Sequence, residues 1–442
     1  MWNSWLDFFV DPILAAPMWA TMLMCLITSV MGVLMVVQKR ALLGEAISHT
    51  TYLGIAVMIY ASADLMNPSS TWFPFLVMIG ALASALMGVR LIFFMEKKQK
   101  VSADSALCFV LSTFLGLGVL MASRLQLTHP VWSQKIQMFL YGQAATITMS
   151  HVWIYAVLTV LIVTVLYCIY PRLLVVFFDR QFAKTADINT HLIHWVVEIL
   201  LVCAIVVGIR SVGVLMMSGM LIAPAAAAKA VGRHFSHVIA IAGFFGVVSG
   251  VIGNVVSVVL SQNLQESLAN FRVTFPTGPM ILISSVFLSL ILSVFGKRKG
   301  YFWRLLRRNK FRISCTSENI LKALLKQEKA MTFWEIKNML VISSRVLIRS
   351  LFPLILDRFL VVKQGKFSLN TRGELRAKRI VRLHRLWEVY LFNELGVHAG
   401  DVHRSAEEME HILTPEIERQ LIQLLGNPEK DPHDQIIPLR EV

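Results

Sequence analysis

Charged residues are scarce in this 442-residue chain, and they are scarcest over its first two thirds. Asp, Glu, Lys and Arg make up 16% of the residues, while hydrophobic residues make up 56%. Apolar runs of about 20 residues recur, and they exceed what a globular core can hide, which excludes an ordinary soluble domain over this part. We therefore expect a polytopic membrane protein followed by a soluble region in the more polar remainder.

Three further features are missing, and each absence removes a class of protein. The five cysteines include no CxxC pair, so the sequence supports neither a disulfide framework nor a zinc ribbon. No GxxxxGK[ST] motif occurs, so this chain is not expected to hold nucleotide phosphates in the P-loop manner. The first residues, MWNSW, have no basic segment and no cleavage site, and we expect no removed signal peptide.

Nine apolar runs are long enough to cross, or nearly cross, a bilayer. They cover about residues 18–37, 41–60, 72–95, 105–123, 151–170, 192–209, 212–229, 236–260 and 277–295. Basic residues such as Lys39, Arg180, Lys229 and Lys297 gather on one side, which the positive-inside rule places in the cytoplasm. The sequence thus predicts an all-α bundle of eight or nine membrane helices, with its N-terminus outside and everything after Gly296 cytoplasmic.

One polar pair lies within these apolar runs. Glu45 and His49 are four residues apart and share one face of the predicted helix. A carboxylate and an imidazole are suitable ligands for a divalent metal, and inside a membrane such groups usually face a bundle interior or a wet path. Two other interpretations remain open on the residues alone: a Glu–His hydrogen bond, or a Glu45 side chain that extends toward Lys39 and Arg40.

Three other segments in or beside the membrane region have distinctive compositions. Residues 171–186 mix aromatic and charged residues, which is typical of an interfacial helix or of a docking helix for a cytoplasmic partner. Small residues crowd 208–228 and favour close helix packing. The polybasic run 297–312 is expected to lie on anionic headgroups as a linker, in preference to binding nucleic acid.

The basic half of the tail has the pattern of a winged helix. Residues 313–382 hold 14 Lys and Arg against 5 Asp and Glu. We predict helices at 319–326, 332–340 and 345–356, with Thr332 as a cap, and a hairpin of strands 359–363 and 366–370. In such a module, Ser343, Ser344, Arg345 and Arg349 would reach DNA, although Pro353 should bend the third helix. Use of the winged helix for protein contacts alone is the alternative.

The acidic half of the tail, residues 383–442, holds 12 Asp and Glu against 5 Lys and Arg. Six potential metal ligands lie on two predicted helices: His384 and Glu388 on one, and His403, Glu407, Glu410 and His411 as a stripe on the next. Three imidazoles and three carboxylates can hold a six-coordinate ion. Without a thiol, this set favours Mn(II) or Fe(II), with zinc as a further candidate.

Three stretches of the membrane region resemble the ABC-3 family of permeases, the membrane subunits for manganese, zinc or iron import. Residues 40–49 with 53–56 resemble its LLGDAISHAVLPGIA motif, 212–228 its VGxLLxxxLLIxPAAxA motif, and 178–183 its FDxxxA turn. The resemblance covers about residues 15–296. It departs from the family at Glu45, where Asp is usual.

This resemblance implies that Glu45 and His49 line the ion path, and that Phe178, Asp179 and Ala183 meet the ATPase. It implies a separate ATPase subunit, because this chain has no P-loop, and a second permease subunit, identical or homologous. No extracytoplasmic module large enough to capture metal is present in the sequence, so we also expect a separate extracytoplasmic metal-binding protein.

Residues 317–440 resemble the diphtheria-toxin-repressor family of metal-dependent regulators. The matching segments are 384–388 (HRLWE), 401–403 (DVH), 409–411 (MEH) and 431–438 (DPHDQIIP). Their metal residues would be the six ligands named above, and Glu407 stands where manganese-responsive members have Glu and iron-responsive members have Cys. Two departures stand out: Asn319 and Lys322 occupy ligand positions of the family's first helix, and its SH3-like domain is absent.

The whole chain resembles the permease–repressor fusions of chlamydiae. We predict a permease at 1–296, a linker at 297–316, a winged helix at 317–382 and a metal-binding and dimerisation domain at 383–442, which would bind operator DNA as a homodimer. We also hypothesise that the tail is cut free near 297–316. Two alternatives remain: a metal-sensing autoinhibitory tail that does not bind DNA, and an unrelated secondary transporter, which would need more intramembrane carboxylates than Glu45 and Glu198.

Overall fold

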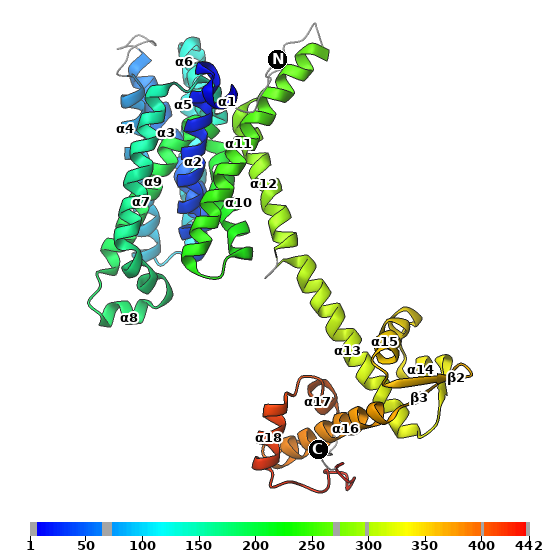
Figure 1. Cartoon of the computed structure of the whole chain (residues 1–442). Coiled ribbons are helices and arrows are strands. Elements are labelled where there is room, and N and C mark those ends of the chain that lie inside the picture. The colour runs from blue at the N-terminus through cyan, green and yellow to red at the C-terminus, as the bar shows by residue number, and fades with distance from the viewer. Residues whose placement is uncertain (1–6, 64–72, 268–274, 297–299, 399–401, 439–442) are drawn as a thin grey trace. The chain divides into compact units, whose positions relative to one another are not determined.

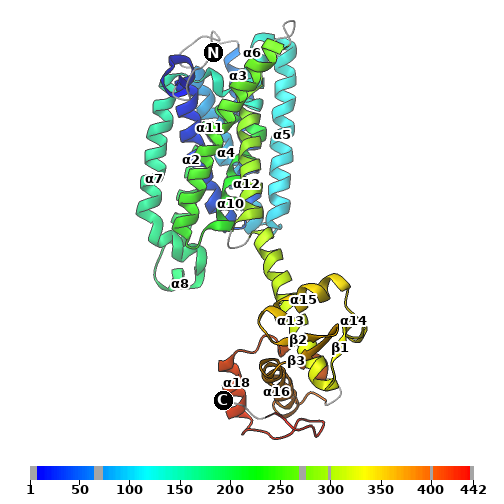
Figure 2. The same ribbon diagram turned by 45° about the vertical axis from the view of Figure 1, so that its right-hand side comes forward.

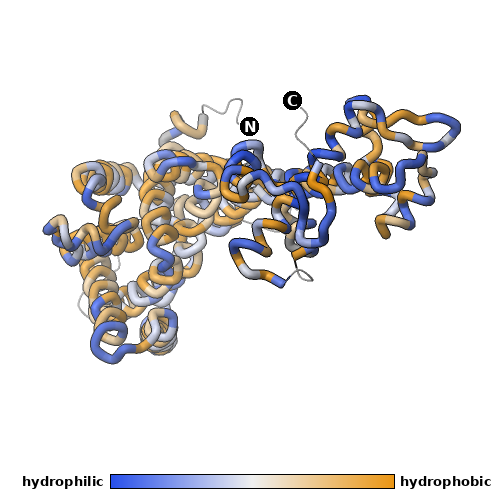
Figure 3. Tube along the Cα trace, turned by 90° about the horizontal axis from the view of Figure 1, so that it is seen from below, coloured by the Kyte–Doolittle hydropathy of each residue, from blue (hydrophilic) through white to orange (hydrophobic). Residues whose placement is uncertain are grey.

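The computed structural model describes residues 7–63, 73–267, 275–296, 300–398 and 402–438, and most of them are helical (Figure 1). The chain divides into two compact units, Met1–Trp303 and Arg304–Val442. In the view coloured by hydropathy, the helices of the first unit are mostly apolar, whereas those of the tail are mixed (Figure 3).

Nine helices in the described part of the first unit are long and apolar enough to cross a bilayer. They are α2 (Pro12–Val37), α3 (Ala41–Ala63), α4 (Phe73–Lys97), α5 (Ala103–Thr128), α7 (Met149–Phe178), α9 (Thr190–Val212), α10 (Val214–Val231), α11 (Phe235–Ser267) and α12 (Thr277–Phe295). Shorter helices α1 (Asp7–Val10), α6 (Pro130–Tyr141), η1 (Ala144–Thr146) and α8 (Arg180–Thr185) lie between them. Each predicted run corresponds to one of the nine, so the predicted helical membrane bundle is confirmed.

Helix α3 lies inside this unit, packed against α4, α5 and α10. In its apolar window 72% of the residues are buried, compared with 17% for α7 and for α12, which therefore present apolar side chains outward. Figure 2 shows α7 and α5 at the two sides of the bundle. Glycines allow close packing around α3: a Cβ on Gly54 would lie 2.1 Å from the carbonyl oxygen of Gly80 in α4.

Two glycines with positive φ allow close backbone contact between the segment that follows α6 and the junction of α9 and α10. Gly142, after α6, has φ 73°, and Gly213, between α9 and α10, has φ 94°. A Cβ on Gly213 would lie 2.4 Å from the carbonyl oxygen of Leu140, and one on Gly142 would lie 2.2 Å from the carbonyl carbon of Val212. Both positions therefore require glycine for conformation and for space.

Gly213→Ala should destabilise the membrane unit by about 1–3 kcal/mol, because alanine would be strained at this φ and would meet the neighbouring backbone. Gly116→Ala is the matched control, since a Cβ there meets nothing within 4 Å. Thermal denaturation of the detergent-solubilised chain, followed by gel filtration, should show a lower midpoint for Gly213→Ala only. Equal midpoints for the two variants would contradict this account of the junction.

The tail unit begins with α13 (Tyr301–Gln327) and continues through β1 (Met331–Thr332), α14 (Phe333–Leu340), α15 (Ser344–Leu356), β2 (Leu360–Lys363), β3 (Lys366–Leu369), α16 (Thr371–Asn393), α17 (Val402–Met409) and α18 (Pro415–Leu424). The three strands form an antiparallel sheet in the order β1-β3-β2. Helices α13, α14 and α15 followed by the β2–β3 hairpin give the order of elements predicted for a winged helix.

Local sequence signals explain these tail elements. Thr332 and Glu335 form a capping box at the start of α14, as each side chain accepts the backbone N–H of the other. Gln364 and Gly365 both have positive φ, which suits the two-residue turn between β2 and β3. Helix α15 continues past Pro353 to Leu356, so the proline stands in its last turn.

Two predicted boundaries do not appear as breaks in the chain. The described part of the predicted linker, residues 300–316, is helical from Tyr301 and continues without interruption into the first tail helix. The predicted boundary at 382/383 falls in the middle of α16. Both segments are rich in Leu, Arg and Lys and lack internal proline, so helix propensity continues across both predicted boundaries, including 382/383, where the charge changes sign.

Candidate metal centre

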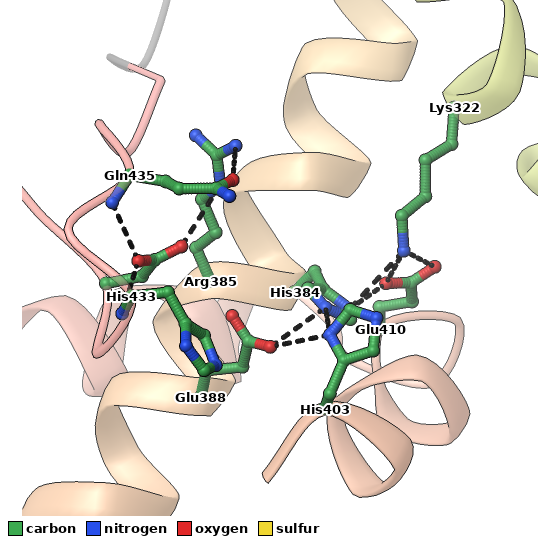
Figure 4. Close-up of polar contacts among 9 residues, drawn as sticks. Lys322, His384, Arg385, Glu388, His403, Glu410, His433 and Gln435 are labelled. Atoms are coloured by element: carbon green, nitrogen blue, oxygen red, sulfur yellow. Dashed lines mark hydrogen bonds and ion pairs between the residues drawn. The ribbon is translucent and has the colours of Figure 1, made fainter. Parts of the chain in front are cut away.

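Helices α16 and α17 bring three potential metal ligands together. His384 and Glu388 are one turn apart on α16, and His403 approaches them from α17 (Figure 4). Among the described residues, these three form a group whose ligand atoms all lie within 4.8 Å of one another. His384 and Glu388 are buried, while the side chain of His403 is 63% exposed, so one side of the group is open.

The distances within this group suit a single metal ion. Nε2 of His384 lies 3.2 Å from Oε1 of Glu388 and 3.1 Å from Nδ1 of His403, and that Nδ1 lies 2.9 Å from the same Oε1. Adjacent ligands of an octahedral ion, each about 2.1 Å from the metal, are separated by about 3.0 Å. Two imidazoles and one carboxylate would therefore occupy one face of an octahedron and leave further positions open.

A fourth residue, Glu410, contacts the opposite nitrogen of His384. Its Oε2 lies 2.5 Å from Nδ1 of His384, and the Nζ of Lys322 lies 2.9 Å from Oε2 and 3.2 Å from Oε1 of the same carboxylate (Figure 4). Both ring nitrogens of His384 lie near a carboxylate, and the shorter contact, 2.5 Å at Nδ1 against 3.2 Å between Nε2 and Glu388, favours the Nδ1–H form of the neutral ring. Nε2 then has the free electron pair that a metal requires.

The charges in the cluster depend on these contacts. Burial alone would lower the pKa of His384, but hydrogen bonds with Glu388 and Glu410 outweigh it and raise the pKa above 6.5. Burial would raise the pKa of Glu388, yet hydrogen bonds with His384 and His403 bring it down to about 2. The pKa of Glu410 is likewise lowered against burial, by His384 and Lys322. Both carboxylates are thus ionised at neutral pH, and an incoming metal would displace imidazole protons.

The predicted stripe of four ligands on one helix is wrong in part. Helix α17 ends at Met409, so Glu410 and His411 lie in the turn that leads to Pro415 at the start of α18. The Glu407 side chain is exposed on α17 and is not one of the three grouped ligands. The structure thus groups His384, Glu388 and His403, with Glu410 behind them, and places Glu407 and His411 elsewhere.

His411 belongs to a second, separate cluster. Its Nδ1 lies 2.7 Å from Oε2 of Glu318 on α13, and Oε1 of Glu318 accepts a hydrogen bond of 2.6 Å from Arg376. Nε2 of His411 lies 3.7 Å from Oε1 of Glu410. Sequence reasoning missed Glu318, although it lies one turn from Lys322 on the same helix face. Asn319, named as a departure, has a buried Oδ1 with no hydrogen-bond partner.

In the membrane unit, the other predicted pair lies on the inner helix α3. His49 is 7% exposed, and its Nδ1 is buried without a hydrogen-bond partner. Glu45 is half-buried one turn earlier. The side chain of Arg40, which the sequence offered as a partner for Glu45, instead pairs with Glu96 at 2.8 Å.

The predicted ATPase-contacting residues lie at the end of α7 (Phe178), at the junction residue Asp179 and in α8 (Ala183). Oδ1 of Asp179 accepts the N–H of Phe182 at 2.9 Å and caps the helix. Ala183 is buried beside Val176 and Ile193, while Phe178 is 67% exposed. The segment is therefore anchored on one side and presents an aromatic residue on the other.

The predicted DNA-contacting residues lie at the start of α15. Ser343 is the N-cap and makes no side-chain capping bond, and Ser343, Arg345 and Arg349 are exposed, while Ser344 is half-buried. The opposite face of α15 packs into the tail core through Leu347.

Comparison with known proteins agrees with both units. The family model described as the ABC 3 transport family matches residues 10–296, and the model of the iron dependent repressor, metal binding and dimerisation domain matches residues 370–439. A probable metal transport system membrane protein of Chlamydia trachomatis is 33% identical over 452 residues, which cover 98% of this chain and 97% of the relative.

Two further relatives match mainly the membrane unit. The zinc transport system membrane protein TroC of Treponema pallidum is 30% identical over 302 residues, 68% of this chain and 95% of the relative. The structure of PsaBC from Streptococcus pneumoniae is 20% identical with a TM-score of 0.56, and the match covers 67% of this chain and 96% of that one. This last likeness concerns the fold alone.

The fold and the histidine–carboxylate cluster define a multi-pass membrane permease joined to the metal-binding part of a repressor. The chain belongs to the ABC 3 transport family. It combines a metal-transport permease with a metal-dependent repressor domain in one polypeptide.

Proposed function

We propose that this chain is the membrane subunit of an ABC importer for a divalent metal, and that its tail represses transcription when it binds the same class of ion. The permease role rests on family membership over residues 10–296. The sensing role rests on the three ligand atoms of His384, Glu388 and His403, whose mutual distances near 3 Å match one face of an octahedral ion.

The ion path passes Glu45 and His49. Helix α3 is surrounded by other helices, and a buried imidazole nitrogen without a partner is costly unless a ligand completes its bonding. An oxygen and a nitrogen ligand one turn apart suit a divalent ion in transit, and they accept manganese, iron and zinc alike. Glu45, where the family usually has Asp, provides the same charge on a longer side chain.

His49→Ala and Glu45→Gln should each lower metal uptake at least tenfold, equivalent to about 1.4 kcal/mol of lost ion stabilisation. Glu45→Asp keeps the carboxylate and should retain uptake. His237→Ala, at an exposed histidine of α11, is the matched control. The measurement is uptake of radioactive Mn(II) into proteoliposomes that contain the reconstituted transporter. If His49→Ala and Glu45→Gln both transported Mn(II) at the wild-type rate, an ion path past these two residues would be excluded.

The partners follow from the permease role. A separate ATPase docks on α8 through Phe178 and the turn capped by Asp179, with Ala183 anchoring the helix. Beside this segment lies a cavity of about 600 Å³, lined by residues from α4, α7, α8 and α9 that include Arg180 and Glu198. An extracytoplasmic binding protein delivers the metal, and a second permease subunit, identical or homologous, completes the path. The N-terminus lies outside and the tail lies in the cytoplasm.

Manganese and iron fit the tail site best. Its donors are imidazole nitrogen and carboxylate oxygen without a thiol, and the open side left by the exposed His403 allows six-fold coordination. Zinc remains a candidate cargo for the permease, because TroC of Treponema pallidum is named for zinc transport. Another similar protein, from Bacillus subtilis, is named for manganese transport.

The tail reads operator DNA with α15. Arg345 and Arg349 lie one turn apart on its exposed face, and Lys363 and Lys366 flank the exposed turn of the β2–β3 hairpin. Basic residues on a helix and on an adjacent wing suit phosphate and base contacts along one groove. A homodimer of the tail would present two such surfaces to a two-fold symmetric operator.

In gel-shift assays, the unit 304–442 should slow the migration of DNA from upstream of the gene that encodes this chain, and only when Mn(II) is present. Arg345→Ala with Arg349→Ala should weaken binding and make the slope of log affinity against log salt less negative by about 2, because two phosphate contacts are lost. Glu388→Gln should abolish the response to Mn(II). Arg419→Ala, at an exposed arginine of α18, is the control, and no retardation in any condition would refute DNA binding.

A second candidate role for the tail is a metal-gated inhibitory contact with protein and not with DNA. The exposed face of α15 also contains apolar residues at helical spacing, Ile348 at 58% exposure and Phe352 at 68%. Such residues suit a protein surface better than a phosphate backbone. The gel-shift assay above separates the two roles.

The tail is released from the membrane by proteolysis near 297–316, because a DNA reader tethered to the bilayer would search the genome poorly. Residues 301–312, the start of α13, are all exposed. Immunoblots of native cells with an antibody against the tail should show a fragment of the size of 304–442 beside the full-length chain. Detection of the full-length chain alone would exclude release.

A further inference from the structure

The positive charge of Lys322 neutralises the carboxylate of Glu410, as a bound metal cation would. The Glu410 side chain is fully buried, and both of its oxygens lie within 3.2 Å of Nζ of Lys322. The same Nζ lies 3.4 Å from Nδ1 of His384. Lys322 comes from α13, far from Glu410 in sequence, so the packing of the tail brings this cation to the carboxylate.

This arrangement separates two sets of metal-ligating side chains. Nε2 of His384, with Glu388 and His403, faces one direction, while Nδ1 faces Glu410 and Lys322 (Figure 4). On the Nδ1 side, Glu410, His411 and Glu318 would provide two carboxylates and an imidazole. Each of these carboxylates already has a basic partner, Lys322 for Glu410 and Arg376 for Glu318.

A divalent ion on the Nδ1 side would have to displace Lys322 from Glu410 and then remain beside its ammonium. Repulsion between the two cations, together with the loss of a buried ion pair, opposes such binding. On the Nε2 side, the contacts of His384 Nε2, Glu388 and His403 are with one another, so among the described residues no lysine or arginine has to leave before an ion binds there.

We infer that Lys322 is a built-in substitute for a second metal, so that each tail binds one divalent ion, at His384, Glu388 and His403. Glu410 is then a positioning residue: it is held by Lys322, it fixes the orientation of the His384 ring through the contact with Nδ1, and it does not ligate the ion. This inference deepens the proposed sensing role and rests on it.

The test counts Mn(II) per chain in the full-length protein, purified in detergent, gel-filtered and measured by mass spectrometry of the metal. Lys322→Glu removes the internal cation and adds a carboxylate, so it should raise the count by one relative to wild type. Lys326→Glu, an exposed residue one turn further along α13, makes the same charge change and should leave the count unchanged. Any metal bound in the membrane unit contributes equally to all three proteins.

Substitutions of the ligands separate the two sites. Glu388→Gln should lower the wild-type count by one, whereas His411→Ala should leave it unchanged. Loss of an ion in His411→Ala, or no gain in a folded Lys322→Glu variant, would overturn the single-ion inference alone. No loss in Glu388→Gln would overturn the proposed sensing site instead.

Glu410→Gln gives a second measurement that does not depend on the folding of the lysine variant. As a positioning residue, Glu410 should affect affinity and not number, so Glu410→Gln should weaken Mn(II) binding about 10- to 100-fold while the count at saturating Mn(II) stays the same. A count lower by one would show that Glu410 ligates an ion of its own, and the inference would fail.

Discussion

A carboxylate buried in the tail needs positive charge beside it, and this need determines how the helices of the tail pack. An unpaired buried charge costs several kcal/mol, so each buried acidic residue fixes the position of a partner. Glu418 on α18 lies 2.8 Å from Arg382 on α16. Glu410 holds Lys322 of α13, and Glu388 holds His403 of α17. Ion pairs thus hold α18 and α17 directly on α16, while α13 is connected to α16 through Glu410, which contacts both Lys322 and His384.

The basic partners of these carboxylates differ in kind, and the difference supports Glu388 as part of the proposed metal site. Glu418 is paired with an arginine and Glu410 with a lysine, and neither of these cationic side chains is a suitable metal ligand, so an ion could bind at either carboxylate only after the cation had moved away. The partners of Glu388 are histidines, which can exchange protons for a metal. Of these three described carboxylates, Glu388 is the one at which a divalent ion would not have to displace a lysine or an arginine, and it is also where the cluster opens to solvent through His403.

The sequence predicted much of this architecture because its signals are local. Long apolar runs, the capping box at Thr332 and the Gln364-Gly365 turn each act within a few residues of chain. His384 and Glu388 could be placed one turn apart for the same reason. The contact between Lys322 and Glu410 could not be predicted, because 88 residues separate the two and only tertiary packing brings them together. The end of α17 at Met409 was missed because nothing in the residues from 402 to 411 breaks a helix; the following turn and the partners on α13 decide where Glu410 and His411 lie.

The unbroken course of α16 connects the proposed metal site with the proposed DNA-binding surface. Its first half packs through Ala377 and Ile380 into the hydrophobic core that also contains residues of α13, α14, α15 and β2, and its second half carries His384 and Glu388. The helix is continuous from Thr371 to Asn393, so within it no break separates the residues of the proposed metal site from those that pack against α13, α14 and α15. A metal ion that fixes α17 on α16 therefore acts on the same element that supports α15 and the hairpin. Helix α13 makes a second connection: Leu321 and Leu324 pack in the same hydrophobic core, and Lys322 pairs with Glu410 beside the proposed metal site.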